Sequence, residues 1–246
     1  MTRRPEDVMK PYYSEPGIEI YHGDCRDILP HLPKVDLVLT DPPYDIFTHR
    51  GAMTKDGSSF GVSFSEMRDI PGLVGLLLDR CDKWSIVFCS LEMLGSYQAV
   101  RPENYVRGGV WDRIINAPQL SGDRPAQGAE GIAILNGRTG RMRWNGGGSA
   151  AIWRAEVERG RKLHPTQKPL NLFTDLIGKF SQEGETVLDP YMGSGTTLVA
   201  ARQLSRRAIG IEIEKKYCDI AIDRLRQEVL PLNQPTYEKH EQGEML

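Results

Sequence analysis

The chain has 246 residues and a net charge of −2, with 39% hydrophobic and 26% charged residues, which is ordinary for a globular protein. Its length predicts one large domain, or one domain with a modest insertion. The charge balance argues against a protein that coats nucleic acid nonspecifically. No run of apolar residues approaches the roughly 20 needed to cross a bilayer. The N-terminal residues lack the apolar core of a secretory signal, so we expect a cytoplasmic protein without a membrane partner.

Cysteines and histidines show no metal-binding or disulfide pattern. The five histidines form no H-x-x-x-H or H-E-x-x-H motif, and the four cysteines form no C-x-x-C pair. This spacing predicts reduced, mostly buried thiols and no metal site. The cysteines are Cys25, Cys81, Cys89 and Cys218.

The predicted elements alternate between strands and helices along the chain. Hydrophobic patterning predicts a short helix after Gly23 and longer helices over residues 70–80, 91–100, 170–180, 196–204 and 217–229. Strands are predicted over residues 17–21, 35–40, 84–89, 106–111, 131–136, 186–189 and 207–213. Residues 1–16 and 231–246 are expected to be flexible tails, and residues 45–66 a long loop. The alternation predicts an α/β fold with a doubly wound, mostly parallel sheet.

The tetrapeptide Asp41-Pro42-Pro43-Tyr44 follows directly on the apolar strand predicted over residues 35–40. In a doubly wound sheet this position lies at the carboxyl end of a strand, where ligands bind. A carboxylate, two rigid prolines and an aromatic ring form a small, stiff pocket rich in hydrogen-bond acceptors. Such a pocket suits a flat heterocycle that carries an amino group.

A second segment has the pattern of a nucleotide-type cofactor loop. A strand ends at Asp189, a glycine turn follows at Gly193-Ser194-Gly195, and a helix begins at Thr196-Thr197. Glycines let a ligand approach the backbone, and the hydroxyl residues are expected to cap the helix. No G-K-[ST] sequence is present, so this is not a phosphate loop for ATP.

Glu212 ends the next predicted strand, 23 residues after Asp189. An acidic residue at this distance typically binds the ribose hydroxyls of an adenosine. The same pair would serve NAD, but Leu198 occupies the place of the third glycine in that motif. Asp189 also favours a positively charged ligand, such as S-adenosylmethionine (AdoMet), over a pyrophosphate.

The middle of the chain is basic. Residues 101–162 contain eleven Lys or Arg against six Asp or Glu, a net charge of +5 against −7 for the remainder. Trp111, Trp144 and Trp153 are interspersed among the arginines. This composition is typical of a surface that contacts phosphates.

These segments together resemble the DNA amino-methyltransferases that modify adenine N6 or cytosine N4. The order is that of the circularly permuted arrangement, in which the Asp-Pro-Pro-Tyr segment precedes the recognition region and the AdoMet loop comes last. The resemblance covers residues 18–225, and the compact middle region is similar to that of phage and prophage enzymes. It depends on Gly23-Asp24-Cys25, Asp41-Pro42-Pro43-Tyr44, His164-Pro165-Thr166-Gln167-Lys168-Pro169, and Asp189–Thr197 with Glu212.

The resemblance implies a catalytic segment formed by Asp41, Pro42, Pro43 and Tyr44. In this family the target base is flipped out of double-stranded DNA, because its amino group is unreachable in the stack. Tyr44 would stack on the flipped ring. Asp41 and the carbonyl of Pro42 would accept hydrogen bonds from the amino group, whose nitrogen attacks the AdoMet methyl without a covalent enzyme intermediate.

The resemblance also implies AdoMet as the cofactor, with no metal required. Asp24 would receive the adenine amino group, and Thr166, Gln167 and Lys168 would contact the carboxylate side of the cofactor or fix the catalytic loop. The expected cofactor-binding residues are Asp24, Cys25, Asp41, Thr166, Gln167, Lys168, Asp189, Met192, Gly193, Ser194, Gly195, Thr196, Thr197 and Glu212. Residues 17–100 and 163–230 would form the catalytic and AdoMet-binding parts of one domain, with residues 101–162 as target-recognition region.

Asp rather than Ser at position 41 favours adenine N6, a tendency of the family, and cytosine N4 stays an alternative. Cytosine-C5 methylation is set aside, because no Pro-Cys dipeptide occurs. Glutamine and RNA methyltransferases normally place the cofactor loop first, unlike this chain. Two alternatives belong to other functional classes. One is a nuclease that uses Asp189 with Glu214-Lys215-Lys216, and the other is a non-catalytic nucleic-acid-binding module. A homodimer and a cognate restriction enzyme are left open.

Overall fold

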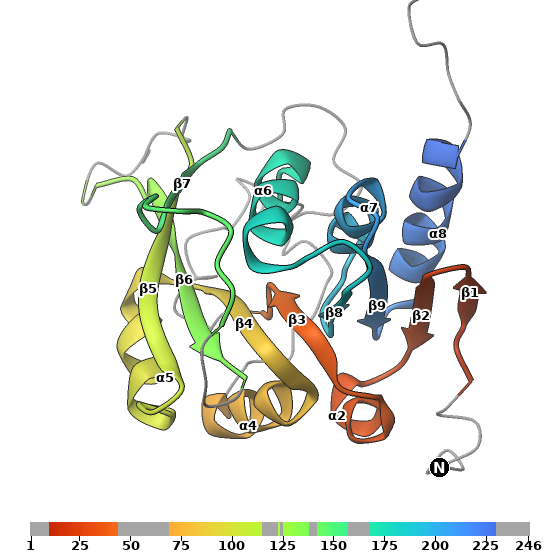
Figure 1. Cartoon of the computed structure of the whole chain (residues 1–246), viewed down its shortest axis with the longest axis horizontal. Coiled ribbons are helices and arrows are strands. Elements are labelled where there is room, and N and C mark those ends of the chain that lie inside the picture. Colours follow the sequence, from red (N-terminus) through yellow and green to blue (C-terminus); the bar gives the residue numbers. More distant parts are fainter. Residues whose placement is uncertain are drawn as a thin grey trace, which may run out of the picture.

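The computed structural model describes residues 10–43, 69–114, 123, 125–137, 142–156 and 168–229. These residues form a nine-stranded sheet with helices on both faces (Figure 1). The strands are β1 (Tyr13–Glu15), β2 (Ile18–His22), β3 (Val35–Thr40), β4 (Cys81–Cys89), β5 (Tyr105–Asp112), β6 (Ala129–Asn136), β7 (Ile152–Arg154), β8 (Thr186–Asp189) and β9 (Arg207–Glu212). The helices are α2 (Cys25–Ile28), α4 (Ile70–Arg80), α5 (Leu94–Val100), α6 (Leu170–Phe180), α7 (Thr196–Gln203) and α8 (Lys215–Val229), with 3₁₀ turns η1 (Leu29–His31) and η2 (Leu91–Met93).

The sheet has the order β1-β2-β9-β8-β3-β4-β6-β5-β7. The five central strands, β2, β9, β8, β3 and β4, are all parallel, so their carboxyl ends lie at one edge. β6 runs antiparallel to β4 and β5, while β7 pairs in parallel with β5. The predicted α/β class and mostly parallel sheet are confirmed.

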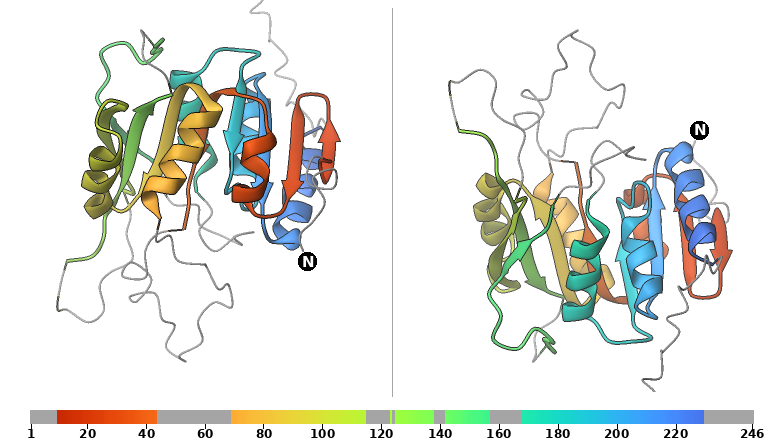
Figure 2. Two further views of the ribbon diagram at one scale, coloured as in Figure 1. Left: turned by 90° about the horizontal axis from the view of Figure 1, so that it is seen from below. Right: turned by 90° about the horizontal axis from the view of Figure 1, so that it is seen from above.

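Each face of the sheet has its own hydrophobic core. Helices α6, α7 and α8 cover one face and α2, α4 and α5 cover the other (Figure 2). Strand β3 contributes to both cores, because Leu37 and Leu39 point to the first face and Val38 to the second. A continuous apolar run is what a strand buried on both faces requires.

Several elements differ from their predicted limits. Residues 10–16 do not form a loose arm, because β1 pairs antiparallel with β2, with Tyr13 opposite Ile20. Strand β7 was not predicted, and the helix expected over residues 91–100 begins as the 3₁₀ turn η2. Strands of three residues have too few positions to show a period, and a neighbouring strand supplies their hydrogen bonds.

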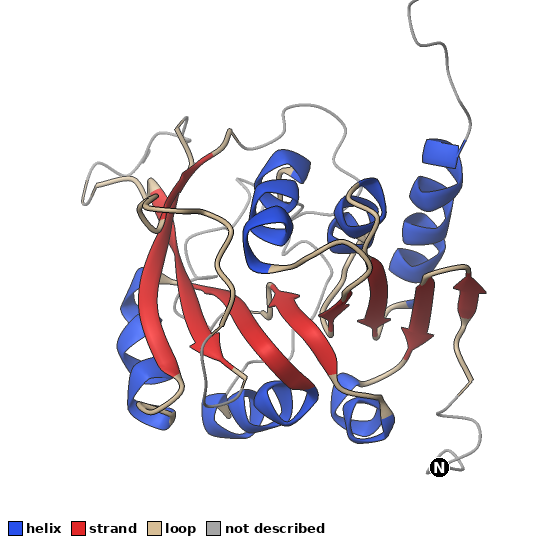
Figure 3. Ribbon diagram, viewed as in Figure 1, coloured by secondary structure: helices blue, strands red, loops and turns tan. Residues whose placement is uncertain are grey.

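The middle region is continuous with the sheet, which Figure 3 shows by secondary structure. Strands β5, β6 and β7 extend the sheet through pairing of β6 with β4. The loop expected over residues 45–66 and the tail over residues 231–246 lie outside the described residues. Within the described ranges, every helix is too short or too polar to traverse a bilayer.

Candidate active site

The predicted site segments meet at the carboxyl edge of the parallel strands. Asp24 lies two residues after the end of β2, and Glu212 is the last residue of the neighbouring strand β9. The last residue of β2, His22, lies opposite Glu212. Strand β8, which ends at Asp189, lies between β9 and β3, and Asp41 follows β3. From β8 the chain continues through α7 to β9 on one side, whereas from β3 it reaches α4 and β4 on the other. Open α/β sheets bind ligands at such a switch point.

Asp189 is the buried centre of this edge, with 3% of its surface exposed. Its Oδ1 accepts hydrogen bonds from Oγ1 of Thr40 at 2.8 Å and from the backbone nitrogen of Tyr191 at 3.1 Å. The hydroxyl of Thr197 donates to Oδ2. Burial raises the pKa of Asp189 to about 7, although these three donors oppose the shift. Asp189 thus joins the end of β3 to the start of α7 and titrates near neutral pH.

The glycine turn between β8 and α7 has a left-handed backbone conformation that favours glycine. Gly193 and Gly195 have φ angles of +51° and +80°. A Cβ atom at Gly195 would lie 2.7 Å from Cβ of Ala221 on α8. Glycine at position 195 therefore lets the turn pack closely against α8, while a close approach of a cofactor to this backbone stays a prediction.

The hydroxyl residues of this turn do not cap α7, contrary to the prediction. The N-cap residue is Gly195, and the helix start has no side-chain cap within the described residues. Arg224 on α8 donates from Nη1 to the carbonyl oxygen of Ser194 at 2.8 Å and to Oγ1 of Thr196 at 3.1 Å. The left-handed conformation of Gly195 starts the helix, so the hydroxyls turn toward Arg224 and Asp189 instead. The side chain of Met192 is also buried.

Glu212 lies beside this turn and holds its backbone. Its Oε2 accepts a hydrogen bond from the nitrogen of Gly193 at 3.0 Å, and its Oε1 accepts one from the nitrogen of Glu214 at 2.8 Å. Burial raises the pKa of Glu212, against the effect of these backbone donors. A partly desolvated carboxylate next to a glycine turn fits the ribose of an adenosine cofactor.

Asp24 caps the short helix α2. Its Oδ1 accepts hydrogen bonds from the backbone nitrogen and from Nε of Arg26, each at 2.9 Å. The hydrogen bonds from the Arg26 side chain lower the pKa of Asp24. An adenine amino group would share this carboxylate with Arg26. The adjacent Cys25 is buried, and burial raises the pKa of its thiol, so its side chain is part of the core. All four cysteines are free and buried, as predicted.

Lys168 contacts the Asp-Pro-Pro-Tyr segment directly. Its Nζ donates to Oδ2 of Asp41 at 2.5 Å, and only 9% of its side chain is exposed. The resemblance allows two roles for this lysine, which would either contact the carboxylate side of the cofactor or fix the loop that contains Asp41. The ion pair with Asp41 is the contact that the second role requires.

Glu130, near the start of β6, is a further residue at this site that the sequence analysis did not predict. Its Oε2 lies 3.1 Å from Nζ of Lys168, so the lysine bridges Glu130 and Asp41. The ammonium group also lies 5.2 Å from the ring centre of Phe88 and 5.8 Å from that of Trp111. Glu130 belongs to none of the motifs identified in the sequence. The one feature that could have indicated it is its charge, directly before the apolar run 131–135 of a predicted strand.

Three predicted site residues, Tyr44, Thr166 and Gln167, lie outside the described residues, so their roles stay predictions. The remaining members of the predicted catalytic segment follow β3, with Pro42 buried and Pro43 partly buried. Among the residues that the structure describes, no cluster of three His, Cys, Asp or Glu side chains is arranged to hold a metal ion.

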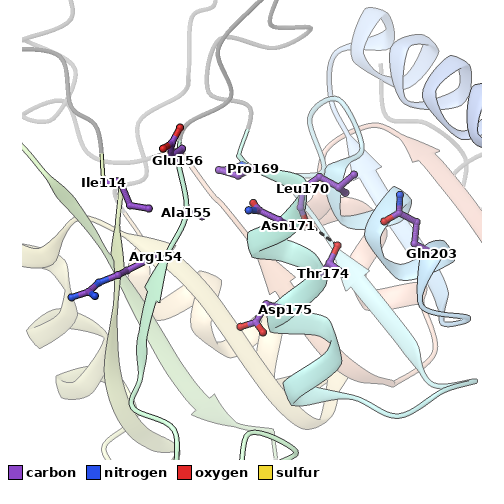
Figure 4. Close-up of a pocket in the computed structure, with 10 residues that line it drawn as sticks. All are labelled: Ile114, Arg154, Ala155, Glu156, Pro169, Leu170, Asn171, Thr174, Asp175 and Gln203. Carbon is purple, nitrogen blue, oxygen red and sulfur yellow. Dashed lines mark hydrogen bonds between the residues drawn. The ribbon is translucent and has the colours of Figure 1, made fainter.

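A groove of about 890 Å³ opens between the end of β7 and the start of α6 (Figure 4). Pro169, next to Lys168, lines it, but no residue of the predicted cofactor set does. It is therefore a feature separate from the cofactor turn. Its lining residues are Ile114, Arg154, Ala155, Glu156, Pro169, Leu170, Asn171, Thr174, Asp175 and Gln203.

Known proteins resemble this chain over most of its length. Residues 92–223 match the model of the N6/N4 methyltransferase family, described as DNA methylase. The chain is 28% identical to the type II methyltransferase M.HinfI of Haemophilus influenzae, over 85% of this chain and 68% of that protein. It is 29% identical to M2.DpnII of Streptococcus pneumoniae, over 90% and 94%. The solved M1.HpyAVI–SAM complex superimposes with a TM-score of 0.65 at 28% identity, covering 84% of this chain and 99% of that one.

Proposed function

Because the chain belongs to the N6/N4 DNA methylase family, we propose that it methylates the N6 amino group of an adenine flipped out of double-stranded DNA. The coarser function follows from the family: the protein is a DNA methyltransferase of the amino-methylating type, and AdoMet is its methyl donor. The observation that supports a catalytic site is the buried ion pair of Asp41 with Lys168 at the switch point of the sheet.

The choice of adenine rests on the residue at position 41. The chain has Asp-Pro-Pro-Tyr, whereas cytosine-N4 enzymes of the arrangement that it resembles more often begin this segment with Ser. Cytosine N4 is the second candidate, since its amino group would fit the same acceptors. The permuted arrangement and the phage likeness also remain proposals.

In the proposed site, Asp41 and the carbonyl of Pro42 accept hydrogen bonds from the target amino group, and Tyr44 stacks on the base. The nitrogen lone pair is then directed away from the ring. AdoMet supplies an electrophilic methyl group when bound. Lys168 holds the carboxylate of Asp41 in place, so the site works by positioning and electrostatics rather than by a strong nucleophile.

The cofactor would lie along β9 and β8. We assign Glu212 to the ribose, Asp24 to the adenine amino group, and the backbone of residues 192–197 to close contact with the cofactor. Asp189 would contribute negative charge opposite the sulfonium. Thr166 and Gln167 complete the proposed set, and Cys25 would contribute through its backbone.

DNA recognition is assigned to residues 101–162, which carry the excess of positive charge. Their strands β5, β6 and β7 lie beside β4 in the same sheet, so a duplex bound there would lie next to Asp41. The groove between β7 and α6 is lined by Arg154, Asn171 and Gln203, whose side chains would donate hydrogen bonds to DNA phosphates. A homodimer and a partner restriction enzyme are not part of the proposal.

The decisive experiment supplies the purified protein with methyl-labelled AdoMet and unmethylated duplex DNA. The DNA is then digested and the labelled nucleoside identified. N6-methyladenine is the expected product. N4-methylcytosine would keep the mechanism and overturn the base, while label-free DNA with bound AdoMet would favour a non-catalytic binding module.

Replacing Glu212 by Ala should weaken AdoMet binding about tenfold or more and change the maximal rate less, since it removes a charge-assisted hydrogen bond to the ribose. Glu212→Gln is a useful intermediate, because its amide oxygen can still accept from Gly193. The neighbouring Glu214→Ala is the matched control, since Glu214 donates its hydrogen bond to Glu212 from the backbone nitrogen, which the substitution retains. Titration calorimetry gives the dissociation constants. An unchanged constant for Glu212→Ala would remove this residue from the ribose site.

AdoMet affinity should fall as the pH is lowered through about 7, the pKa of Asp189. Below that pH the buried carboxyl gains a proton and loses the charge opposite the sulfonium. We expect the dissociation constant to rise roughly tenfold between pH 8 and pH 6, in inverse proportion to the ionised fraction of Asp189. Asp189→Asn should bind more weakly and show a flat profile, whereas Glu212→Gln should retain the slope. A flat profile for the wild-type protein would contradict the assignment of Asp189.

A further inference from the structure

We propose that Glu130 is a positioning residue of the methyltransferase site, holding Lys168 where its ammonium group orients the carboxylate of Asp41. The proposal rests on the proposed function, because it takes Asp41 as the acceptor of the target amino group. Glu130 lies 89 residues after Asp41 and 38 residues before Lys168, and no sequence motif connects it to either residue. Only the fold brings β6 next to β4, and Glu130 thereby close to Lys168 and Asp41.

The first support is the geometry of the lysine. Nζ of Lys168 lies 2.5 Å from Oδ2 of Asp41 and 3.1 Å from Oε2 of Glu130. All three side chains are largely buried, with 17%, 9% and 11% of the surface of Asp41, Lys168 and Glu130 exposed. At this burial a lysine between two carboxylates has little freedom to take another rotamer, so removal of one carboxylate changes where it donates.

The second support is the surface on which the ammonium group lies. The rings of Phe88 and Trp111 come within 6 Å of Nζ, at a distance where a cation and an aromatic face attract each other. Trp111 lies opposite Glu130 in the pairing of β5 with β6. Strands β4 and β5 thus supply the two rings beside the ammonium group, and β6, which lies between them, supplies Glu130.

Glu130 also has a second cationic neighbour. Its Oε1 lies 3.7 Å from Nη1 of Arg113, directly after the end of β5. The charges alternate from Asp41 through Lys168 and Glu130 to Arg113. Glu130 is thereby the link between the catalytic carboxylate and the part of the chain to which we assign DNA recognition.

A second bridge of the same composition provides a matched control. At the opposite edge of the sheet, Lys83 bridges Asp36 at 2.9 Å and Glu185. Asp36 belongs to β3 and Lys83 to β4, while Glu185 directly precedes β8. Removing one carboxylate there breaks an ion pair of the same composition, although a more exposed one, and leaves the site untouched.

The test compares Glu130→Gln with Glu185→Gln in the full-length protein. We expect Glu130→Gln to lower kcat for DNA methylation by about 10- to 100-fold through misplacement of Asp41. We expect the AdoMet dissociation constant to change by less than about twofold, since the cofactor contacts are retained. Glu185→Gln should keep the wild-type kcat, and Glu130→Asp, which restores the charge on a shorter arm, should recover part of it.

The pH profile gives a readout that a purely structural role would not move. Burial opposes the charge of Lys168, but Asp41 and Glu130 together raise its pKa above the ordinary value. Glu130→Gln removes one of these carboxylates, so the alkaline limb of kcat should move to lower pH. Among the described residues, the other ionisable groups near the two carboxylates include Cys89, Tyr97, Asp189 and Arg113, and these four are unchanged in the variant.

The outcomes separate this inference from the proposed function. If the wild-type protein transfers no label to DNA, the proposed function itself is wrong. If the wild-type protein is active and Glu130→Gln matches Glu185→Gln in kcat and in its alkaline limb, Glu130 is not a positioning residue. A lower kcat with a displaced alkaline limb and intact AdoMet binding supports it.

Discussion

Asp41→Asn should reduce methyl transfer by at least about 10³-fold, the effect expected when a preorganised charge at the reacting group is removed. The amide nearly keeps the shape of the carboxylate, and its oxygen can still accept from Lys168. It offers the target amino group a neutral acceptor and places an NH₂ group where an oxygen was. Initial rates with labelled AdoMet measure the loss.

AdoMet binding should survive this substitution, with a dissociation constant within about threefold of the wild-type value. Asp36→Asn is the control, because Asp36 lies on the same strand β3, at its amino end, and pairs with Lys83 at 2.9 Å. It should be fully active. Loss of AdoMet binding together with activity in Asp41→Asn would refute the division between a catalytic Asp41 and a separate cofactor turn.

Lys168→Met should destabilise the protein by about 3–5 kcal/mol, the usual cost of removing one partner of a buried ion pair. Methionine fills most of the volume of the lysine stem but leaves Asp41 and Glu130 close together without the cation between them. Such a loss corresponds to a decrease in Tm of roughly 10 °C for a domain of this size. Thermal unfolding followed by circular dichroism measures it, and methyl transfer should fall with it.

Lys83→Met is the matched control for this loss. Lys83 also bridges two carboxylates, but 37% of its side chain is exposed, so solvent screens the pair and the expected cost is only about 1 kcal/mol. Its activity should stay at the wild-type level below Tm. Equal losses of stability in the two lysine variants would contradict the argument that burial makes the Lys168 bridge contribute more to stability than the exposed Lys83 bridge.

Local patterns determined much of the fold. The limits of β3, α4 and β8 agree with the sequence, because a continuous apolar run or a regular apolar period leaves little choice of element. The alternation of strands and helices was enough to predict the doubly wound sheet and its ligand-binding edge. The Asp-Pro-Pro-Tyr segment and the glycine turn could be found because each is contiguous in the chain.

Only the tertiary structure decided which residues surround Asp41. Lys168 and Glu130 are 127 and 89 positions away from it in the sequence, and neither residue type indicates its partner. The short strands β1 and β7 likewise depend on their neighbours for hydrogen bonds. A short segment of sequence is enough to specify a helix or strand, because the contacts that determine it lie only a few residues apart in the chain. An ion pair between distant strands depends on the order of the strands in the sheet, which no single segment contains.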